Sequence, residues 1–169
     1  MRGLILGGGC RALDLTRALV ADGHAVRLVT RTEARRAEIE AAGAECWIGT
    51  PDRIGSVRYA LENVTLLFWL LGTATGDAEK LEALHGSRLR MMLEKTTDTT
   101  VRGVIYEAAG TLPDGVLDQG RAEMAFAQKT NEIPYALLES DPHGNRMAWL
   151  DEAHAAIDLL LAGPRRVSV

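Results

Sequence analysis

Short apolar runs and amphipathic stretches alternate along the 169-residue chain. The apolar runs predict six strands, at residues 3–6, 25–30, 44–48, 65–71, 102–106 and 134–138. The stretches between and after them predict helices at residues 11–21, 33–42, 53–61, 78–84, 88–97, 117–130 and 145–161. The run TLLFWLL at residues 65–71 is almost continuously apolar, which is typical of a central parallel strand covered on both faces.

This alternation of strands and helices, with short connections, predicts an α/β fold. We expect a three-layer, Rossmann-like, doubly wound parallel sheet with the strand order 3-2-1-4-5-6 and no separate substrate lobe. The ligand crevice would lie at the carboxyl ends of the strands, near the switch between strands one and four. The domain would span residues 1–162, and residues 163–169 would form a tail.

A glycine-rich turn separates the first predicted strand from the first predicted helix. Gly7, Gly9 and Ala12 have the spacing G-x-G-x-x-A, one form of the dinucleotide fingerprint. Gly7 would permit the tight turn, Gly9 would let the backbone approach a pyrophosphate, and Ala12 would let the helix pack closely on the strand. The free N–H groups and partial positive charge of the helix N-terminus suit a phosphate. The residues expected to bind a dinucleotide here are Gly7, Gly8, Gly9, Cys10, Arg11 and Ala12.

The end of the second predicted strand favours NADP(H) over NAD(H). NAD-binding fingerprints usually place Asp or Glu there to bind the ribose 2′-hydroxyl. This chain has Thr30 and Arg31 at that point, and its next carboxylate is Glu33. Thr30 and Arg31 can donate hydrogen bonds to a 2′-phosphate, which a carboxylate would repel. The alternative is a solvated helix face formed by Arg31, Arg35 and Arg36, which fits the last two better than Arg31.

The composition excludes several classes of partner. Hydrophobic residues make up 47% of the chain and charged residues 25%, and the net charge of −4 argues against nucleic acid or anionic membrane as a partner. No signal-peptide pattern opens the sequence, and no apolar stretch approaches the ~20 residues of a membrane helix. Cys10, Cys46 and the four histidines show no metal-ligand spacing. We expect a cytoplasmic protein without a metal site.

A second pattern follows the glycine turn. Gly23, His24, Val26 and Arg31 have the spacing Gly-His-x-Val-x-x-x-x-Arg. With the apolar strand and glycine turn before it, this segment resembles the opening of atypical short-chain dehydrogenases/reductases, especially the NmrA-like and NAD(P)H-binding groups. Later segments match that family in order and character, namely residues 49–52, 64–72, 104–109 and 133–138 and Glu123. The resemblance implies a Rossmann fold and an NAD(P) cofactor.

The ends of the later strands add candidate cofactor contacts. Leu71 ends the fourth predicted strand, and Gly72 and Thr73 follow it as expected cofactor contacts. Thr73 and Thr75, in the loop after this strand, should face the ribose or pyrophosphate. The resemblance implies an adenine contact near Thr50 and Pro51 and places Glu107 where the family often has Ser or Thr near the nicotinamide.

Two departures from the family concern the chemistry. Its members commonly use Tyr-x-x-x-Lys for proton transfer, and the matching residues here are Leu117 and Arg121. Full-length relatives also carry a substrate lobe after the sixth strand, whereas residues 139–142 lead here into one last helix. The expected cofactor half is therefore complete, while the usual catalytic pair and substrate lobe are missing.

Two residues are candidates for catalysis. Glu107 could orient a substrate or act as an acid or base, and the alternative is a polar residue at the rim of the crevice. His143 is favoured over His85, because it follows the sixth strand and strand ends line the crevice. Tyr106 lies inside the fifth predicted strand and is expected to be structural.

The sequence supports two functional hypotheses. The first is an NADPH-dependent reductase-like oxidoreductase that acts on a small acceptor, such as a flavin or quinone, without a Tyr-Lys pair. The second is a non-catalytic NADP(H)-sensing regulatory or binding protein. Surplus apolar area on the last helix could support a homodimer.

Overall fold

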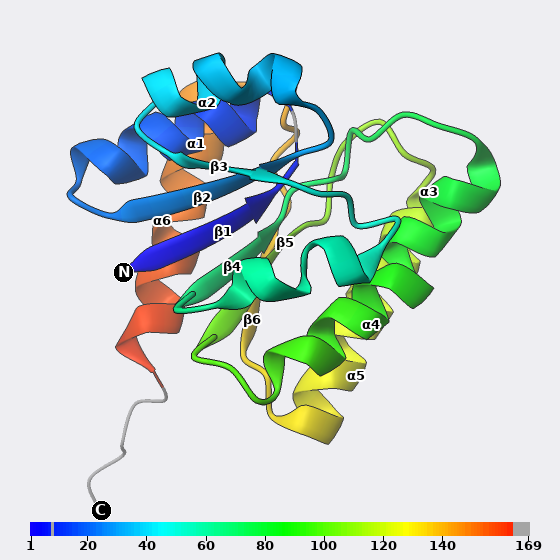
Figure 1. The fold of residues 1–169 in the computed structure, drawn as a ribbon. Helices are drawn as coiled ribbons and strands as arrows, with labels where there is room; N and C mark the ends of the chain where they lie inside the picture. Colours follow the sequence, from blue (N-terminus) through cyan, green and yellow to red (C-terminus); the bar gives the residue numbers. More distant parts are fainter. Residues whose placement is uncertain (8, 164–169) are drawn as a thin grey trace, which may run out of the picture.

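Six parallel strands form one twisted sheet in the computed structural model, which describes residues 1–7 and 9–163 (Figure 1). The strands are β1 (Arg2–Leu6), β2 (Ala25–Thr30), β3 (Glu45–Ile48), β4 (Leu66–Trp69), β5 (Gly103–Glu107) and β6 (Tyr135–Leu138). Their order is β3-β2-β1-β4-β5-β6, which confirms the predicted doubly wound topology. Leu6 at the end of β1 pairs with Val29 on one side and Trp69 on the other, so these strands end at the same edge of the sheet.

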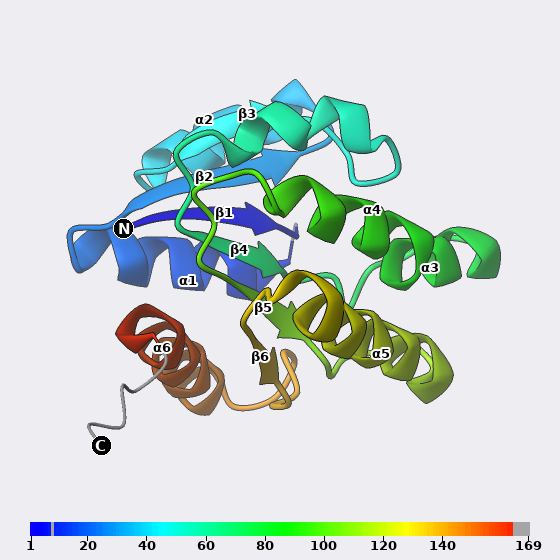
Figure 2. The same ribbon diagram turned by 90° about the horizontal axis from the view of Figure 1, so that it is seen from below.

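Helices cover both faces of the sheet (Figure 2). The helices are α1 (Cys10–Ala21), α2 (Arg36–Ala41), α3 (Ala78–His85), α4 (Ser87–Thr96), α5 (Asp114–Asn131) and α6 (Arg146–Ala162). Buried residues of α1, α2 and α6 pack on one face, and those of α3, α4 and α5 pack on the other. The sheet is therefore the middle of three layers, as the continuously apolar strands predict.

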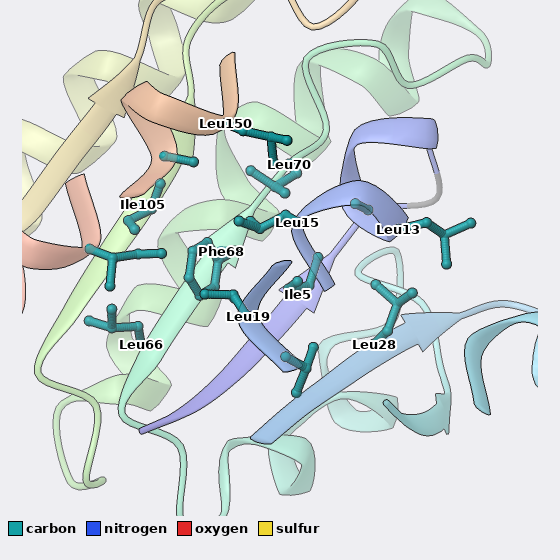
Figure 3. Close-up of a cluster of buried hydrophobic side chains, with 14 of the residues drawn as sticks. Ile5, Leu13, Leu15, Leu19, Leu28, Leu66, Phe68, Leu70, Ile105 and Leu150 are labelled. Carbon is teal, nitrogen blue, oxygen red and sulfur yellow. The ribbon is translucent and has the colours of Figure 1, made fainter. Parts of the chain in front are cut away.

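The core on the α1 side is built from large aliphatic and aromatic side chains (Figure 3). Ile5, Phe68 and Ile105 point from three neighbouring strands toward Leu15 of α1 and Leu150 of α6. Removal of this apolar surface from water is the main force that holds the helices to the sheet. The packing also fixes the N-terminus of α1 over the carboxyl end of β1.

The predicted helix at residues 53–61 is wrong. Two short 3-10 helices, Ile54–Ser56 and Arg58–Leu61, occupy the segment. The apolar residues Ile54, Val57 and Ala60 are spaced by three, so one face of a helix with three residues per turn buries all of them. Gly55 also weakens an α-helix at this place.

Other helix boundaries depart modestly from the predicted ones. The predicted helix at 33–42 begins as the 3-10 turn Glu33–Arg35 before α2, and α5 begins at Asp114, three residues early. Thr32 precedes the turn, but its side chain forms no capping hydrogen bond. Asn145 does cap α6, because its side chain accepts a hydrogen bond from the Ala148 amide.

The last helix, α6, covers the sheet with most of its apolar residues. Leu150, Ala153, Ile157 and Leu160 are buried, whereas Met147 is 60% exposed.

None of the described helices is long and apolar enough to span a membrane. Residues 164–169 of the predicted tail, like Gly8, lie outside the described residues.

Candidate functional site

The turn after β1 needs glycine at its first position. Gly7 has a φ of +151°, a conformation that favours glycine. A Cβ atom there would lie 2.2 Å from the Leu70 carbonyl oxygen at the end of β4. The predicted role of Gly7 in the tight turn therefore agrees with the structure, and Gly8 is not among the described residues.

Gly9 is a different case, because none of the described residues requires glycine there. Its φ of −74° and ψ of 171° are extended and open to any residue. The nearest atom to an added Cβ would be Thr73 Oγ1, at an ordinary 3.8 Å. A side chain at this position would instead project into the space in front of the turn, which Gly9 lines.

The N-terminus of α1 offers unused hydrogen-bond donors beside Gly9. The first amides of a helix have no partner within it, and no described residue accepts a backbone hydrogen bond from Cys10 or Arg11. Ala12 is buried against the sheet, as predicted. Arg11 holds the turn in place, because its guanidinium donates to Asp14 and to the Gly144 carbonyl oxygen, at 3.1 and 2.9 Å.

A cleft of about 530 Å³ opens at the carboxyl ends of β1 to β4. It is lined by Gly9, by residues 29–32, 35, 49–52, 70, 71 and 73–77, and by Lys80, Leu81 and Leu84 of α3. Its volume lies in the range usual for sites that bind small molecules. The predicted contact residues that line it are Gly9, Thr30, Arg31, Thr50, Pro51, Leu71 and Thr73.

The β2 end of this cleft carries donors and no carboxylate. Thr30 is the last residue of β2, and Arg31 follows it as an exposed residue. Among the described residues, none forms an ion pair or hydrogen bond with the Arg31 side chain. Arg36 behaves as a surface residue, because Glu33 and Glu40 bind its guanidinium at 2.6 and 3.3 Å. Arg35 pairs with Glu38 at 3.0 Å and also lines the cleft.

Gly72 does not line this cleft, yet it forms a hydrogen bond that holds two segments of the site together. Its amide donates to Glu107 Oε2 at 2.8 Å, which joins the loop after β4 to the end of β5. A Cβ at Gly72 would lie 2.1 Å from the Ala109 carbonyl oxygen. The predicted contact at Gly72 is therefore a structural hydrogen bond to the protein itself.

Glu107 is buried, although a rim residue would be exposed. Only 2% of its surface is accessible. Burial raises the pKa of its carboxyl to about 7, although the Gly72 N–H group favours the charged form. A carboxyl with this pKa exchanges its proton near neutral pH.

A second, smaller cavity of about 30 Å³ brings both catalytic candidates together. Glu107 lines it from β5, and the exposed His143 lines it from the loop between β6 and α6. Gly9 and the first residues of α1, Cys10 to Ala12, also line it. The two cavities adjoin, because Gly9, Leu70 and Thr73 line both of them.

His85 has a structural role that the sequence interpretation missed. It is fully buried, and its Nδ1 lies 2.6 Å from the Tyr106 hydroxyl. Its Nε2 lies 3.2 Å from the Leu71 carbonyl oxygen, which can only accept. Nε2 therefore carries the proton, and Nδ1 accepts from Tyr106. Burial lowers the pKa of His85 to about 4, so the ring is neutral at physiological pH.

The His85–Tyr106 pair helps to position Leu71, which lines the cleft at the carboxyl ends of β1 to β4. Tyr106 is buried inside β5, as the sequence predicts, and burial raises its pKa above the ordinary value. Gly120 of α5 makes room for this pair, since a Cβ there would lie only 1.8 Å from the Tyr106 hydroxyl oxygen. A glycine in mid-helix facing a tyrosine 14 positions earlier can be recognised only once the packing is known.

The two positions that match the Tyr-x-x-x-Lys pattern hold residues that pack and connect elements of the fold. Leu117 is buried in the packing of α5. Arg121 donates to the Ala108 carbonyl oxygen and to Glu139 Oε1, at 3.0 and 2.9 Å, and so ties α5 to the ends of β5 and β6. Among the described residues, no group of three or more His, Cys, Asp or Glu side chains could hold a metal ion.

The chain shares its fold with several NAD-bound proteins. A short-chain dehydrogenase/reductase superfamily protein from Agrobacterium tumefaciens with bound NAD is 15% identical over 100% of this chain and 64% of its own, with a TM-score of 0.66. UDP-glucuronic acid 4-epimerase from Bacillus cereus in complex with NAD is 13% identical over 83% and 56%, with a TM-score of 0.66.

A third similar structure is the triphenylmethane reductase of Citrobacter sp., which is 16% identical over 81% of this chain and 47% of its own, with a TM-score of 0.59. The chain thus spans about half to two-thirds of the length of these proteins. No protein-family model and no curated protein matches the sequence. The likeness is one of fold, and function must be argued from the site.

Proposed function

We propose that this chain binds NADP(H) in the cleft at the carboxyl ends of β1 to β4 and is a reductase-like oxidoreductase that acts on a small conjugated acceptor of the flavin or quinone kind. The observation that carries the proposal is Gly9. It faces the cleft at the N-terminus of α1, where neither its backbone nor its protein neighbours require glycine. A pyrophosphate beside Gly9 would explain the missing side chain and would use the amides of Cys10 and Arg11.

The remaining cleft residues fit the other parts of a dinucleotide. Thr30 and Arg31 would hold the 2′-phosphate, and Thr50 and Pro51 would border the adenine. Leu71 and Thr73 would face the ribose or pyrophosphate. Two solved structures of the same fold hold NAD, which supports a dinucleotide as the ligand of this cleft.

Arg31→Ala is expected to weaken NADPH binding about 10- to 100-fold, the effect of losing a hydrogen bond between charged groups. NADH binding should stay unchanged, because NADH has no 2′-phosphate. Arg36→Ala is the matched control, since Glu33 and Glu40 already bind that guanidinium. Calorimetric titration of the three proteins with both nucleotides measures the effect. Equal NADPH affinity in Arg31→Ala and wild type would overturn the 2′-phosphate assignment.

The chemistry would depend little on protein acids. When bound, the nicotinamide supplies a hydride. The chain has no Tyr-Lys pair to protonate an alcohol product, because Leu117 and Arg121 occupy those positions. A flavin or quinone has less need of such a pair, since it can accept a hydride into a conjugated system and take its proton from water. The residues would then act mainly by binding and orienting the reactants.

Turnover is tested by NADPH oxidation in the presence of FMN, riboflavin or a soluble quinone. We expect a loss of absorbance that depends on both protein and acceptor, and that is slower with NADH at equal concentration. Gly9→Val is the comparison variant, because its side chain would fill the space in front of the turn. NADPH binding without turnover of any acceptor would contradict the reductase proposal.

A non-catalytic NADP(H) sensor is the second candidate function. The position of Arg121 favours it: this cation occupies the place of the usual Lys, but Glu139 and the Ala108 carbonyl oxygen bind it. It is therefore not available to polarise a proton donor. Tight NADPH binding without turnover would select this function.

A further inference from the structure

The small cavity between α1 and β5 has a polar side chain on the side that faces the glycine turn. Gly9, Cys10 and Arg11 form one wall, and Glu107 lines the other. The volume of about 30 Å³ is enough for one water molecule or one oxygen atom of a ligand. A phosphate at the N-terminus of α1 would therefore place an oxygen near the Glu107 carboxyl.

One oxygen of this carboxyl is anchored and the other is available. Oε2 accepts the hydrogen bond from the Gly72 amide. No described residue forms a hydrogen bond with Oε1, although only 2% of the surface of Glu107 is exposed. The anchor fixes the direction of the carboxyl group, so Oε1 is left to meet a ligand.

Three elements bring charged side chains to the surroundings of Glu107. On α1, Arg11 lines the same cavity, and its guanidinium is bound to Asp14 and to the Gly144 carbonyl oxygen. On the β6–α6 loop, Asp141 raises the pKa of Glu107 further, and His143 is exposed.

The other cation nearby is on α5. Arg121 binds Glu139 and the Ala108 carbonyl oxygen. Within the described chain, Glu107 therefore has no cationic side chain as a partner, which agrees with its raised pKa of about 7.

A charged Glu107 and a bound phosphate would repel each other across this cavity, because both would be anions away from bulk water. A protonated carboxyl would instead donate a hydrogen bond to the ligand oxygen. We propose that Glu107 holds the bound dinucleotide as a neutral carboxylic acid, donating from Oε1 to a ligand oxygen, so that binding takes up a proton at alkaline pH. This inference rests on the proposed NADP(H) site.

Titration with NADP⁺ between pH 7 and pH 9 tests the proposal, because the 2′-phosphate, with a second pKa near 6, is already ionised there. Wild-type affinity should fall about 50-fold from pH 7 to pH 9, as expected for one group that must be protonated in the complex. Calorimetry at pH 8 in two buffers of different ionisation enthalpy should show uptake of about 0.9 proton per ligand bound.

Two variants test whether Glu107 is the group that takes up the proton when NADP⁺ binds. Glu107→Gln keeps an acceptor for the Gly72 amide and a donor for the ligand, so its affinity should be independent of pH and it should take up no proton. Glu62→Gln changes an exposed carboxyl that lines neither cavity, and it should keep the wild-type profile. Circular dichroism confirms that each variant is folded.

The outcomes separate the two proposals. Binding of NADP⁺ without proton uptake by wild type, or an unchanged pH dependence in Glu107→Gln, would overturn the role of Glu107 and leave the cofactor site intact. The wild-type calorimetry gives this result even if Glu107→Gln does not fold. Absence of NADP⁺ binding at every pH would overturn the proposed function itself.

Discussion

Replacing Gly120 by alanine is expected to lower the free energy of unfolding by about 2–4 kcal/mol, near the upper end of overpacking effects. The added Cβ would lie 1.8 Å from the Tyr106 hydroxyl oxygen and 2.3 Å from its Cζ. Tyr106 is fully buried, so neither the ring nor α5 can move without disturbing the core. Urea unfolding followed by circular dichroism measures the loss.

Gly115→Ala is the matched control on the same helix. Apart from its chain neighbours and the backbone of its own helix, no described residue has an atom within 4 Å of the added Cβ. The higher helix propensity of alanine should therefore stabilise the protein by up to about 1 kcal/mol. The same substitution thus has opposite signs at two positions of α5. Equal stability of the two variants would contradict the packing of Gly120 against Tyr106.

Gly7→Ala is expected to weaken NADPH binding by at least about 100-fold. A misplaced turn would lose the two hydrogen bonds that backbone amides are proposed to donate to a charged phosphate. The alanine would need a φ of +151° and would bring its Cβ within 2.2 Å of the Leu70 carbonyl oxygen. Either the turn or the end of β4 must move. Calorimetric titration of the folded variant at elevated protein concentration measures the loss.

Gly23→Ala separates backbone strain from damage to the site. Gly23 has a φ of +81°, and apart from its chain neighbours no described residue has an atom within 4 Å of the added Cβ. This control should lose about 1 kcal/mol of stability from strain alone and bind NADPH like the wild type. If Gly7→Ala bound NADPH as tightly as Gly23→Ala, the dinucleotide could not depend on the turn after β1.

The sheet topology is predictable from the sequence because its signals are local. Each strand is a short apolar run, each helix shows its own periodicity, and the short connections leave few ways to arrange them. The continuously apolar residues 65–71 already mark β4 as a central strand. The prediction of one helix at residues 53–61 was wrong, because the apolar spacing of three was interpreted as part of an α-helix.

The polar parts of the site depend on packing that no local signal carries. His85 and Tyr106 are 21 residues apart, and their hydrogen bond exists because α3 packs over β5. Glu107 ends β5 as predicted, but its burial depends on Gly72, 35 residues away. By contrast, Thr30 and Arg31 reach the cleft simply because they end a parallel strand, so the sequence suffices to place them there.

Titration of the purified wild-type protein with NADPH and NADH tests the proposed site most directly. We expect both nucleotides to compete for one site, with NADPH bound about 10- to 100-fold more tightly through Thr30 and Arg31. If neither nucleotide binds at millimolar concentration, the cleft beside Gly9 is not a dinucleotide site.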